Sequence, residues 1–183
     1  MAKIPKRFQW LNDIGVLPRL LTVGLKYLDL KELPGTKSNN PVIMKWAEEL
    51  GVADIYPNDE VSWCALGMAH ILVEADKPMP YKRYEILRAK SFATWGDVVP
   101  EGDERLGDIL VFNRPGGHHV ALDIAETDKT FWVYGFNQSN KAGFTEIAKN
   151  RLLAARRYYA IGAPASAKKY FMGTSGKVST NEV

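Results

Sequence analysis

The sequence predicts a single α+β domain, with helices in its first half and strands in its second. Up to about residue 90, apolar residues recur at helical spacing between loops made of turn-forming residues. From residue 108 onward, short apolar runs separated by turns replace that pattern. Helices followed by strands indicate N-terminal helices packed on an antiparallel β-sheet. The 183 residues can bury one sizeable core and are too few for two.

The first two expected helices have recognisable beginnings. Pro18 suits the first turn of a helix over residues 17–30. One face of that helix carries Leu17, Leu20, Leu21, Leu25 and Leu28. The second helix is capped by Asn40, opened by Pro41 and ended by Gly51. Both patterns predict amphipathic helices that lay one face on the core.

The third expected helix, residues 62–74, is apolar almost all round. Such a helix belongs in the centre of a domain, because no face of it is suited to water. Residues 33–39 and 54–60 are loops by their turn residues, and a short helical piece is expected near residues 84–90.

Five short apolar runs then predict an antiparallel sheet. The expected strands are residues 108–113, 120–125, 131–136, 144–148 and 152–159. Turn residues at 114–117 and 126–129 indicate hairpins between the first three. The last stretch, 164–183, is rich in Ser, Gly, Lys and Thr and is expected to be an extended tail.

Composition excludes several classes of protein. The single cysteine, Cys64, rules out an internal disulfide and a zinc site with several thiolates. The apolar runs are far shorter than a bilayer-spanning helix requires. Polar residues (Gln9, Asn12 and Asp13) interrupt the apolar stretch after the basic N-terminus, so no export signal is expected.

Charge is unevenly distributed along the chain. Lys and Arg outnumber Asp and Glu in residues 1–28 and 141–183, and the reverse holds between them. Basic ends are either simply solvated or favour an anionic surface such as lipopolysaccharide or an acidic partner protein. Nucleic acid is not an expected partner, because the basic residues lack interleaved aromatics and a binding motif.

Cys64 is a candidate nucleophile. It stands at the expected start of the buried helix, where unpaired N–H groups and the helix dipole favour a thiolate. The simpler interpretation is a small buried apolar residue, as most lone cysteines are. A catalytic role for Cys64 is favoured by the residues that follow in order: an imidazole on a strand and then a polar amide.

The imidazole comes from His118 or His119, since adjacent side chains in a strand point to opposite faces. The alternation of the following residues does not decide between them. A third histidine, His70, lies nearly two turns into the buried helix and is expected to be a hydrogen-bonded packing residue.

Asn137 is the candidate that would orient the imidazole, by accepting a hydrogen bond from its ring N–H. Gln138 is the alternate, for that role or as an oxyanion donor. Ordinary turn chemistry at a strand end would also explain both residues.

A metal site is not expected. Asp108 and Asp123 could join the paired histidines, but adjacent strand histidines cannot both reach one ion without distortion. The sequence also has no His-Glu-x-x-His run. No cofactor is expected either.

Taken together, these motifs resemble a phage and prophage family of papain-like peptidoglycan hydrolases, related to the CHAP (cysteine, histidine-dependent amidohydrolase/peptidase) and NlpC-type domains. The resemblance covers roughly residues 8–159, with further similarity at residues 179–182. Its motifs are residues 59–64, 106–112, 116–122 and 136–139. Two positions depart from the family pattern: Ser62 stands where a proline is common, and Phe136 replaces a glycine, which would crowd the turn before Asn137.

The resemblance implies a papain-like fold with Cys64 as nucleophile, His119 as the catalytic histidine and Asn137 as its partner. It implies hydrolysis of amide bonds in peptidoglycan, by an endopeptidase or an N-acetylmuramoyl-L-alanine amidase. The catalytic domain would span residues 31–160, with 1–30 as a helical lead-in to the same domain and 161–183 as an extended tail. The protein would be made in the host cytoplasm and act in the periplasm or cell wall, or travel with the virion.

A second class of function remains open. The chain could be a non-enzymatic protein of the phage tail or core that retains the fold and binds other virion proteins. The basic ends and Phe136 beside the active-site turn favour this alternative.

Overall fold

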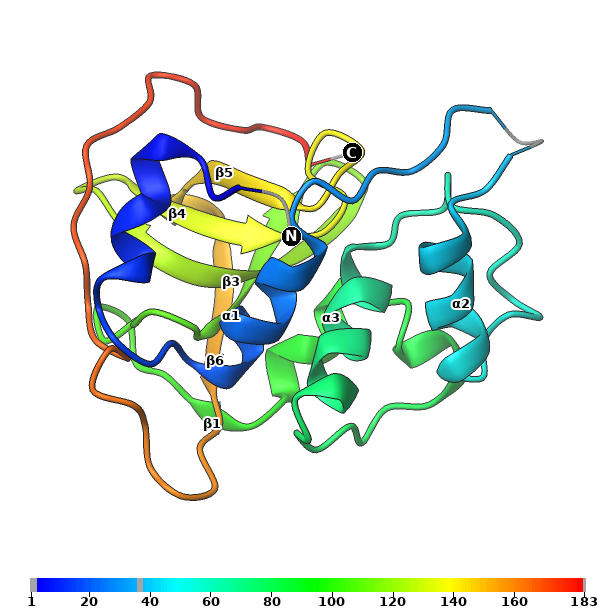
Figure 1. Ribbon diagram of the computed structural model, residues 1–183, viewed down its shortest axis with the longest axis horizontal. Helices are drawn as coiled ribbons and strands as arrows, with labels where there is room; N and C mark the ends of the chain where they lie inside the picture. Colours follow the sequence, from blue (N-terminus) through cyan, green and yellow to red (C-terminus); the bar gives the residue numbers. More distant parts are fainter. Residues whose placement is uncertain (1–2, 36–37, 183) are drawn as a thin grey trace.

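Helices and one antiparallel sheet make up the computed structural model, which describes residues 3–35 and 38–182 (Figure 1). Within these residues the α-helices are α1 (Arg19–Gly24), α2 (Pro41–Glu49) and α3 (Cys64–Glu74). Short 3-10 helices are η1 (Lys6–Asn12), η2 (Leu25–Tyr27), η3 (Arg83–Glu85), η4 (Ala89–Thr94) and η5 (Lys149–Arg151). The strands are β1 (Asp97–Val98), β2 (Ile109–Arg114), β3 (Gly117–Glu126), β4 (Thr130–Gly135), β5 (Gly143–Ala148) and β6 (Leu152–Arg157).

The strands lie in the order β1-β6-β2-β3-β4-β5, and each is antiparallel to its neighbours. The expected α+β class is therefore confirmed. None of the described helices is long and apolar enough to cross a lipid bilayer.

The helix expected over residues 17–30 is shorter than its leucine pattern predicts. α1 ends at Gly24, whose carbonyl accepts a hydrogen bond from the Tyr134 hydroxyl on β4 at 2.6 Å. Farther on, Asp29 has a φ of 66°, and its N–H donates to the Ala142 carbonyl. The chain thus leaves the helix to pair with the loop after β4, a long-range contact that leucine spacing cannot reveal.

Other differences from the expected elements are local. The helical piece near residues 84–90 is two 3-10 helices, η3 and η4, on either side of residues 86–88. The sequence patterns do not predict η1 or β1, and a two-residue strand is too short to show alternation.

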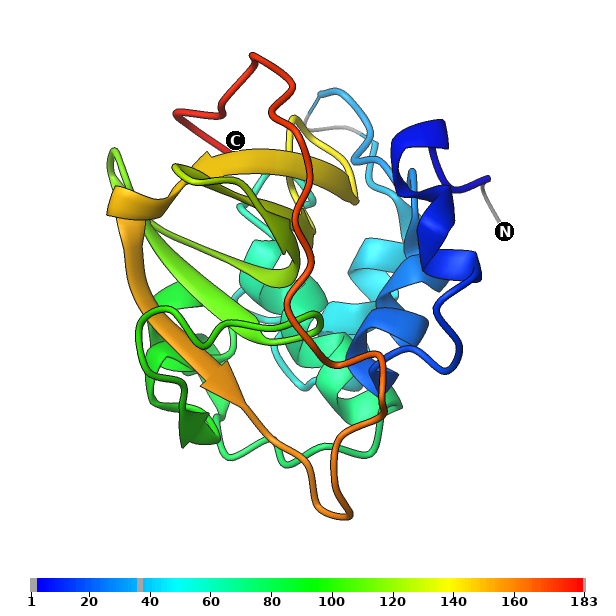
Figure 2. The same ribbon diagram turned by 90° about the vertical axis from the view of Figure 1, so that its left-hand side faces the viewer.

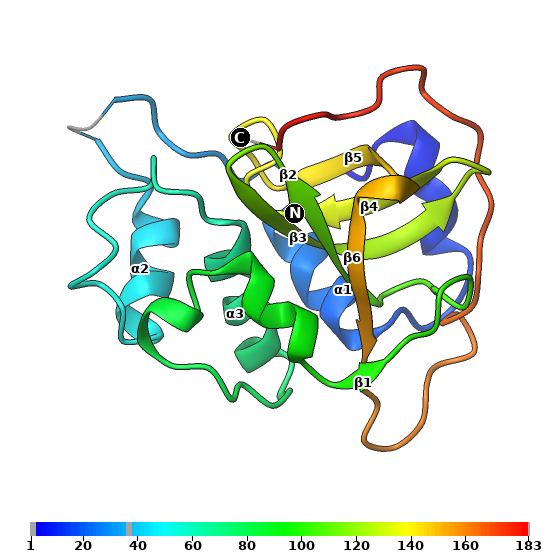
Figure 3. The same ribbon diagram turned by 180° about the vertical axis from the view of Figure 1, so that it is seen from behind.

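The helix α3 lies between α2 and the sheet, with α1 against it (Figures 1 and 3). From Cys64 to Leu72 every side chain of α3 except that of His70 is buried, as its apolar sequence predicts. Its close approach to the sheet depends on Gly67. A Cβ on Gly67 would lie only 2.3 Å from the ring of Phe136.

Phe136 belongs to the core and does not crowd the turn at its position. The ring is fully buried, with Trp46, Trp63 and Tyr134 around it. The missing side chain of Gly67 makes room for the large side chain of Phe136.

We therefore expect Gly67→Ala to destabilise the protein. Alanine improves helix propensity by about 1 kcal/mol, but overpacking a rigid core costs about 1–3 kcal/mol. The new Cβ would lie only 2.3 Å from an aromatic ring, so the packing cost is at the upper end of that range. The variant is therefore expected to be less stable than the parent. Thermal unfolding measures this loss of stability.

Gly173→Ala is the control, since a Cβ there meets nothing within 4 Å and its φ is ordinary. An equal melting temperature for the two variants would contradict this packing argument.

The expected tail from residue 161 onward packs against its own domain (orange to red in Figures 1 and 2). Glu126 at the end of β3 exchanges backbone hydrogen bonds with Tyr170 and Met172, each 2.9 Å long. The Ser179 N–H donates to the Glu146 carbonyl on β5 at 2.7 Å. The tail therefore runs across the sheet and returns toward the hairpin of β2 and β3.

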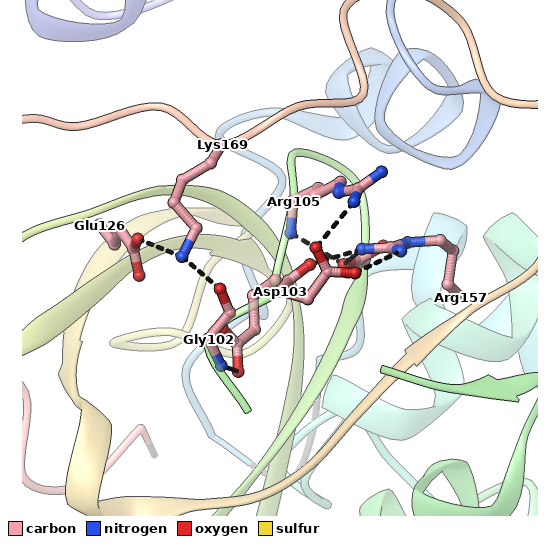
Figure 4. Close-up of polar contacts among 8 residues, drawn as sticks. Gly102, Asp103, Arg105, Glu126, Arg157 and Lys169 are labelled. Atoms are coloured by element: carbon pink, nitrogen blue, oxygen red, sulfur yellow. Dashed lines mark hydrogen bonds and ion pairs between the residues drawn. The ribbon is translucent and has the colours of Figure 1, made fainter. Parts of the chain in front are cut away.

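Two ion pairs lie in this region (Figure 4): the first joins the tail to β3, and the second joins β6 to the residue before β2. The Lys169 Nζ lies 2.8 Å from a Glu126 carboxylate oxygen and donates to the Gly102 carbonyl at 2.7 Å. On β6, Arg157 donates to both carboxylate oxygens of Asp108, at 2.8 and 2.7 Å.

Candidate active site

Cys64 is the first residue of α3, so its thiol lies at the helix end where backbone N–H groups lack intrahelical partners. The side chain is 3% exposed. The Ser62 hydroxyl, two residues earlier, lies 3.7 Å from the Sγ atom. Burial alone would disfavour a thiolate here, so the polar neighbours decide its state.

His119 is the histidine that the structure brings to Cys64. It is 1% exposed, and its ring lies close enough to the thiol to help lower the pKa of Cys64. β3 extends beyond β4, whose last paired residue is Gly135 opposite Ala121. His119 and Val120 thus still pair with β2, and both lie close enough to Cys64 at the start of α3 to lower the pKa of its thiol.

These contacts favour the thiolate. Burial raises the pKa of Cys64, but the hydrogen bond and charge of His119, the Ser62 hydroxyl and the Val120 N–H outweigh it and lower the pKa to about 7. Near neutral pH a large fraction of the thiol is therefore ionised. A thiolate is the form that attacks a carbonyl.

This balance predicts a pH profile for alkylation of Cys64 by iodoacetamide. The rate is expected to rise with pH as the thiol loses its proton, with a midpoint near 7. In His119→Ala the midpoint should move up, because burial then acts with less opposition. Mass spectrometry of the alkylated chain measures both rates. Identical midpoints in the two proteins would show that His119 does not affect the thiol.

Gln138 is the residue that holds the His119 ring. Its Oε1 lies 3.2 Å from Nε2 of His119, and its own amide nitrogen donates to the Gly143 carbonyl. Gly135 makes room for this side chain, because a Cβ there would lie 3.0 Å from Gln138 Oε1. The alternate candidate from the sequence thus occupies the orienting position.

Asn137 forms no hydrogen bond with His119 among the described residues, so the orienting bond that the resemblance assigns to it is made by Gln138. Its φ of 55° is left-handed, which turns its side chain away from the course that Gln138 takes. Its Nδ2 donates to the Ser62 hydroxyl at 3.4 Å, and its Oδ1 is buried without a partner among the described residues. Asn137 therefore contacts the segment that leads into Cys64.

The other histidines lie elsewhere. His118 is partly buried at the start of β3, and burial together with the charges of Lys90 and Arg114 lowers its pKa. His70 is the packing residue that the sequence predicts: its ring stacks on Trp46 and hydrogen-bonds to the Tyr27 hydroxyl at 2.8 Å.

The carboxylates that might have joined a metal site have other surroundings. Asp108 is bound to Arg157, while Asp123 is buried with one oxygen unpartnered, and burial raises its pKa well above the ordinary value. Within residues 3–35 and 38–182, no three His, Cys, Asp or Glu residues gather as a metal site would require.

Sequence reasoning missed Ser62, Arg114 and Asn181 as neighbours of the site. Arg114 donates to the Ser62 hydroxyl at 3.4 Å and to Asn181 Oδ1 at 3.1 Å. Arg114 stands in a Pro-Gly-Gly turn and Asn181 in the tail. Neither position carried a signal beyond the unexplained tail motif.

No family model matches the sequence, and no curated protein matches it.

Proposed function

We propose that this chain is a papain-like thiol hydrolase that cleaves amide bonds of bacterial peptidoglycan. The observation that supports it most is the chain of contacts from Cys64 to His119 to Gln138, at the start of a buried helix. A nucleophile, a base and a residue that orients the base are the parts that thiol catalysis needs. The order of these residues along the chain is that of the family which the motifs resemble.

In the first step, the Cys64 thiolate attacks the amide carbonyl, and the carbonyl electrons move to oxygen. The unpaired N–H of Cys64 at the start of α3 is placed to stabilise this oxyanion. The His119 imidazolium gives its proton to the leaving nitrogen, the C–N bond breaks, and a thioester remains.

Water then completes the cycle. His119 removes a proton from the water, which attacks the thioester carbonyl, and the acid product leaves as the thiolate is restored. Gln138 accepts a hydrogen bond from Nε2 of His119, which leaves Nδ1 for exchange with the thiol and substrate. A neutral amide orients the ring without adding charge.

The peptidoglycan substrate follows from the resemblance, and the test is direct. Purified sacculi are incubated with the protein, and the soluble fragments are analysed by mass spectrometry. New amino and carboxyl ends at one type of amide bond are expected, and their identity distinguishes an endopeptidase from an amidase. Sacculi that stay intact at high protein concentration would contradict the proposal. Intact sacculi together with stoichiometric incorporation of the chain into phage particles would favour the alternative virion protein.

A further inference from the structure

We propose that Arg114, with Lys90 and His118 beside it, forms a subsite that binds a carboxylate of the substrate peptide next to Cys64. This inference rests on the proposed function and specifies the chemistry of the substrate. Its basis is the position of Arg114, the nature of its present partners and the charge around it.

The side chain of Ser62 lies between Arg114 and the Cys64 thiol. It is the last residue of β2, and its Nη2 donates to the Ser62 hydroxyl at 3.4 Å. The same hydroxyl lies 3.7 Å from the Cys64 sulfur. Cys64 and His119 are buried, whereas Ser62 and Arg114 are partly exposed. A peptide that reaches the thiol from this side therefore passes the guanidinium.

The present partners of Arg114 are all neutral. Besides Ser62, Nε donates to the His118 carbonyl at 3.1 Å and Nη1 to Asn181 Oδ1 at 3.1 Å. Among residues 3–35 and 38–182, no carboxylate forms an ion pair with it. Charge-assisted hydrogen bonds of arginine are about 2.7–2.9 Å long, whereas these three bonds to neutral acceptors are longer, at 3.1 to 3.4 Å.

Two other partly buried arginines show what a satisfied guanidinium looks like in this fold. Arg151 binds both carboxylate oxygens of Glu182 at 2.8 and 2.7 Å, and Arg157 binds Asp108 in the same way. Arg114 has the same fork of donors without the anion. A carboxylate would replace Asn181 and Ser62 as acceptors and gain bidentate, charge-assisted bonds.

Positive charge gathers at this edge of the site. The charges of both Lys90 and Arg114 act on His118, in addition to its burial, and lower its pKa. Lys90 is exposed and free to turn toward a ligand. Lys90 and Arg114 supply the positive charge, so an anion is the fitting ligand, and the lowered pKa of His118 favours a neutral ring that can still hydrogen-bond to it. Stem peptides of peptidoglycan carry free carboxylates close to their amide bonds.

The test measures binding without turnover, in the Cys64→Ala protein. A synthetic stem peptide with its carboxylates free, and the same peptide with them amidated, are titrated by calorimetry. The free acid is expected to bind at least about tenfold more tightly, which is the gain that a charge-assisted hydrogen bond supplies. Adding Arg114→Gln should remove that preference, and Arg114→Lys, which keeps the charge without the fork, should retain part of it. Arg83→Gln, a distant surface change, should leave it unaltered.

Equal binding of the two peptides, or a preference that survives Arg114→Gln in a folded protein, would overturn the subsite. Binding of neither peptide would overturn it as well. Because the readout needs no hydrolysis, its failure is distinct from that of the proposed function. An enzyme that cleaves sacculi but binds both peptides equally keeps the function and loses the subsite. A preference that depends on Arg114 in a protein unable to cleave sacculi keeps the subsite alone.

Discussion

Replacing Cys64 with alanine is expected to abolish cleavage of purified murein. The sulfur is the atom that forms the thioester, and no other side chain among the described residues offers a nucleophile next to His119. Removing the nucleophile of a cooperating catalytic set lowers turnover by about 10⁶-fold, below the detection limit of a zymogram. The measurement is a murein zymogram together with mass spectrometry of soluble fragments.

Cys64→Ser provides the matched control for structure. Serine keeps the size of the side chain and a hydrogen-bonding group for His119, but its hydroxyl is far harder to ionise than the thiol. It should fold as the parent does and show at most a trace of cleavage. Thermal unfolding checks the fold of both variants. Full lysis by either folded variant would remove the thiol from the mechanism and leave the virion-protein alternative or another site.

The features that local sequence determines were predictable. Asn40 caps α2 as expected, with its Oδ1 accepting from the Val42 N–H at 2.9 Å. The apolar run after Ser62 becomes a buried helix that begins at Cys64. The hairpins of β2, β3 and β4 lie where turn residues separate apolar runs. Caps, turns and periodicity act over a few residues, so a single sequence displays them.

The sequence did not reveal which amide hydrogen-bonds to His119, because this depends on contacts between distant parts of the chain. The loop from Phe136 to Ala142 is pinned to the start of the chain by backbone hydrogen bonds from Asp29 and Glu32. In this loop Asn137 has a left-handed φ of 55°, and the space above Gly135 receives the longer Gln138 side chain. Sequence spacing placed both amides in the right loop, but the backbone direction decided which one reaches the ring.

Strand periodicity did not distinguish His118 from His119, and only the resemblance favoured His119. The structure buries His119 against Cys64 and Gln138, while His118 faces Lys90 and Arg114. Mutation can now separate the two positions, because their surroundings differ in kind.

His119→Ala is expected to lower kcat by roughly 10²–10⁴-fold, through loss of both the proton donor and the interaction that favours the thiolate. Gln138→Ala should lower kcat less, since the ring stays near the sulfur but loses its fixed orientation. His118→Ala should leave kcat within a few-fold of the parent, because its ring lies outside the contacts of the thiol. Steady-state kinetics on a soluble murein peptide measure all three.

The pH profile distinguishes a chemical role of His119 from a merely structural one. Without His119, the acid limb of kcat/KM, which reports ionisation of Cys64 in the free enzyme, should move to higher pH. His118→Ala should leave that limb in place. A larger loss of kcat in His118→Ala than in His119→Ala would reverse the assignment. It would mean that the strand presents its other face to the thiol during catalysis, and that Gln138 holds a bystander ring.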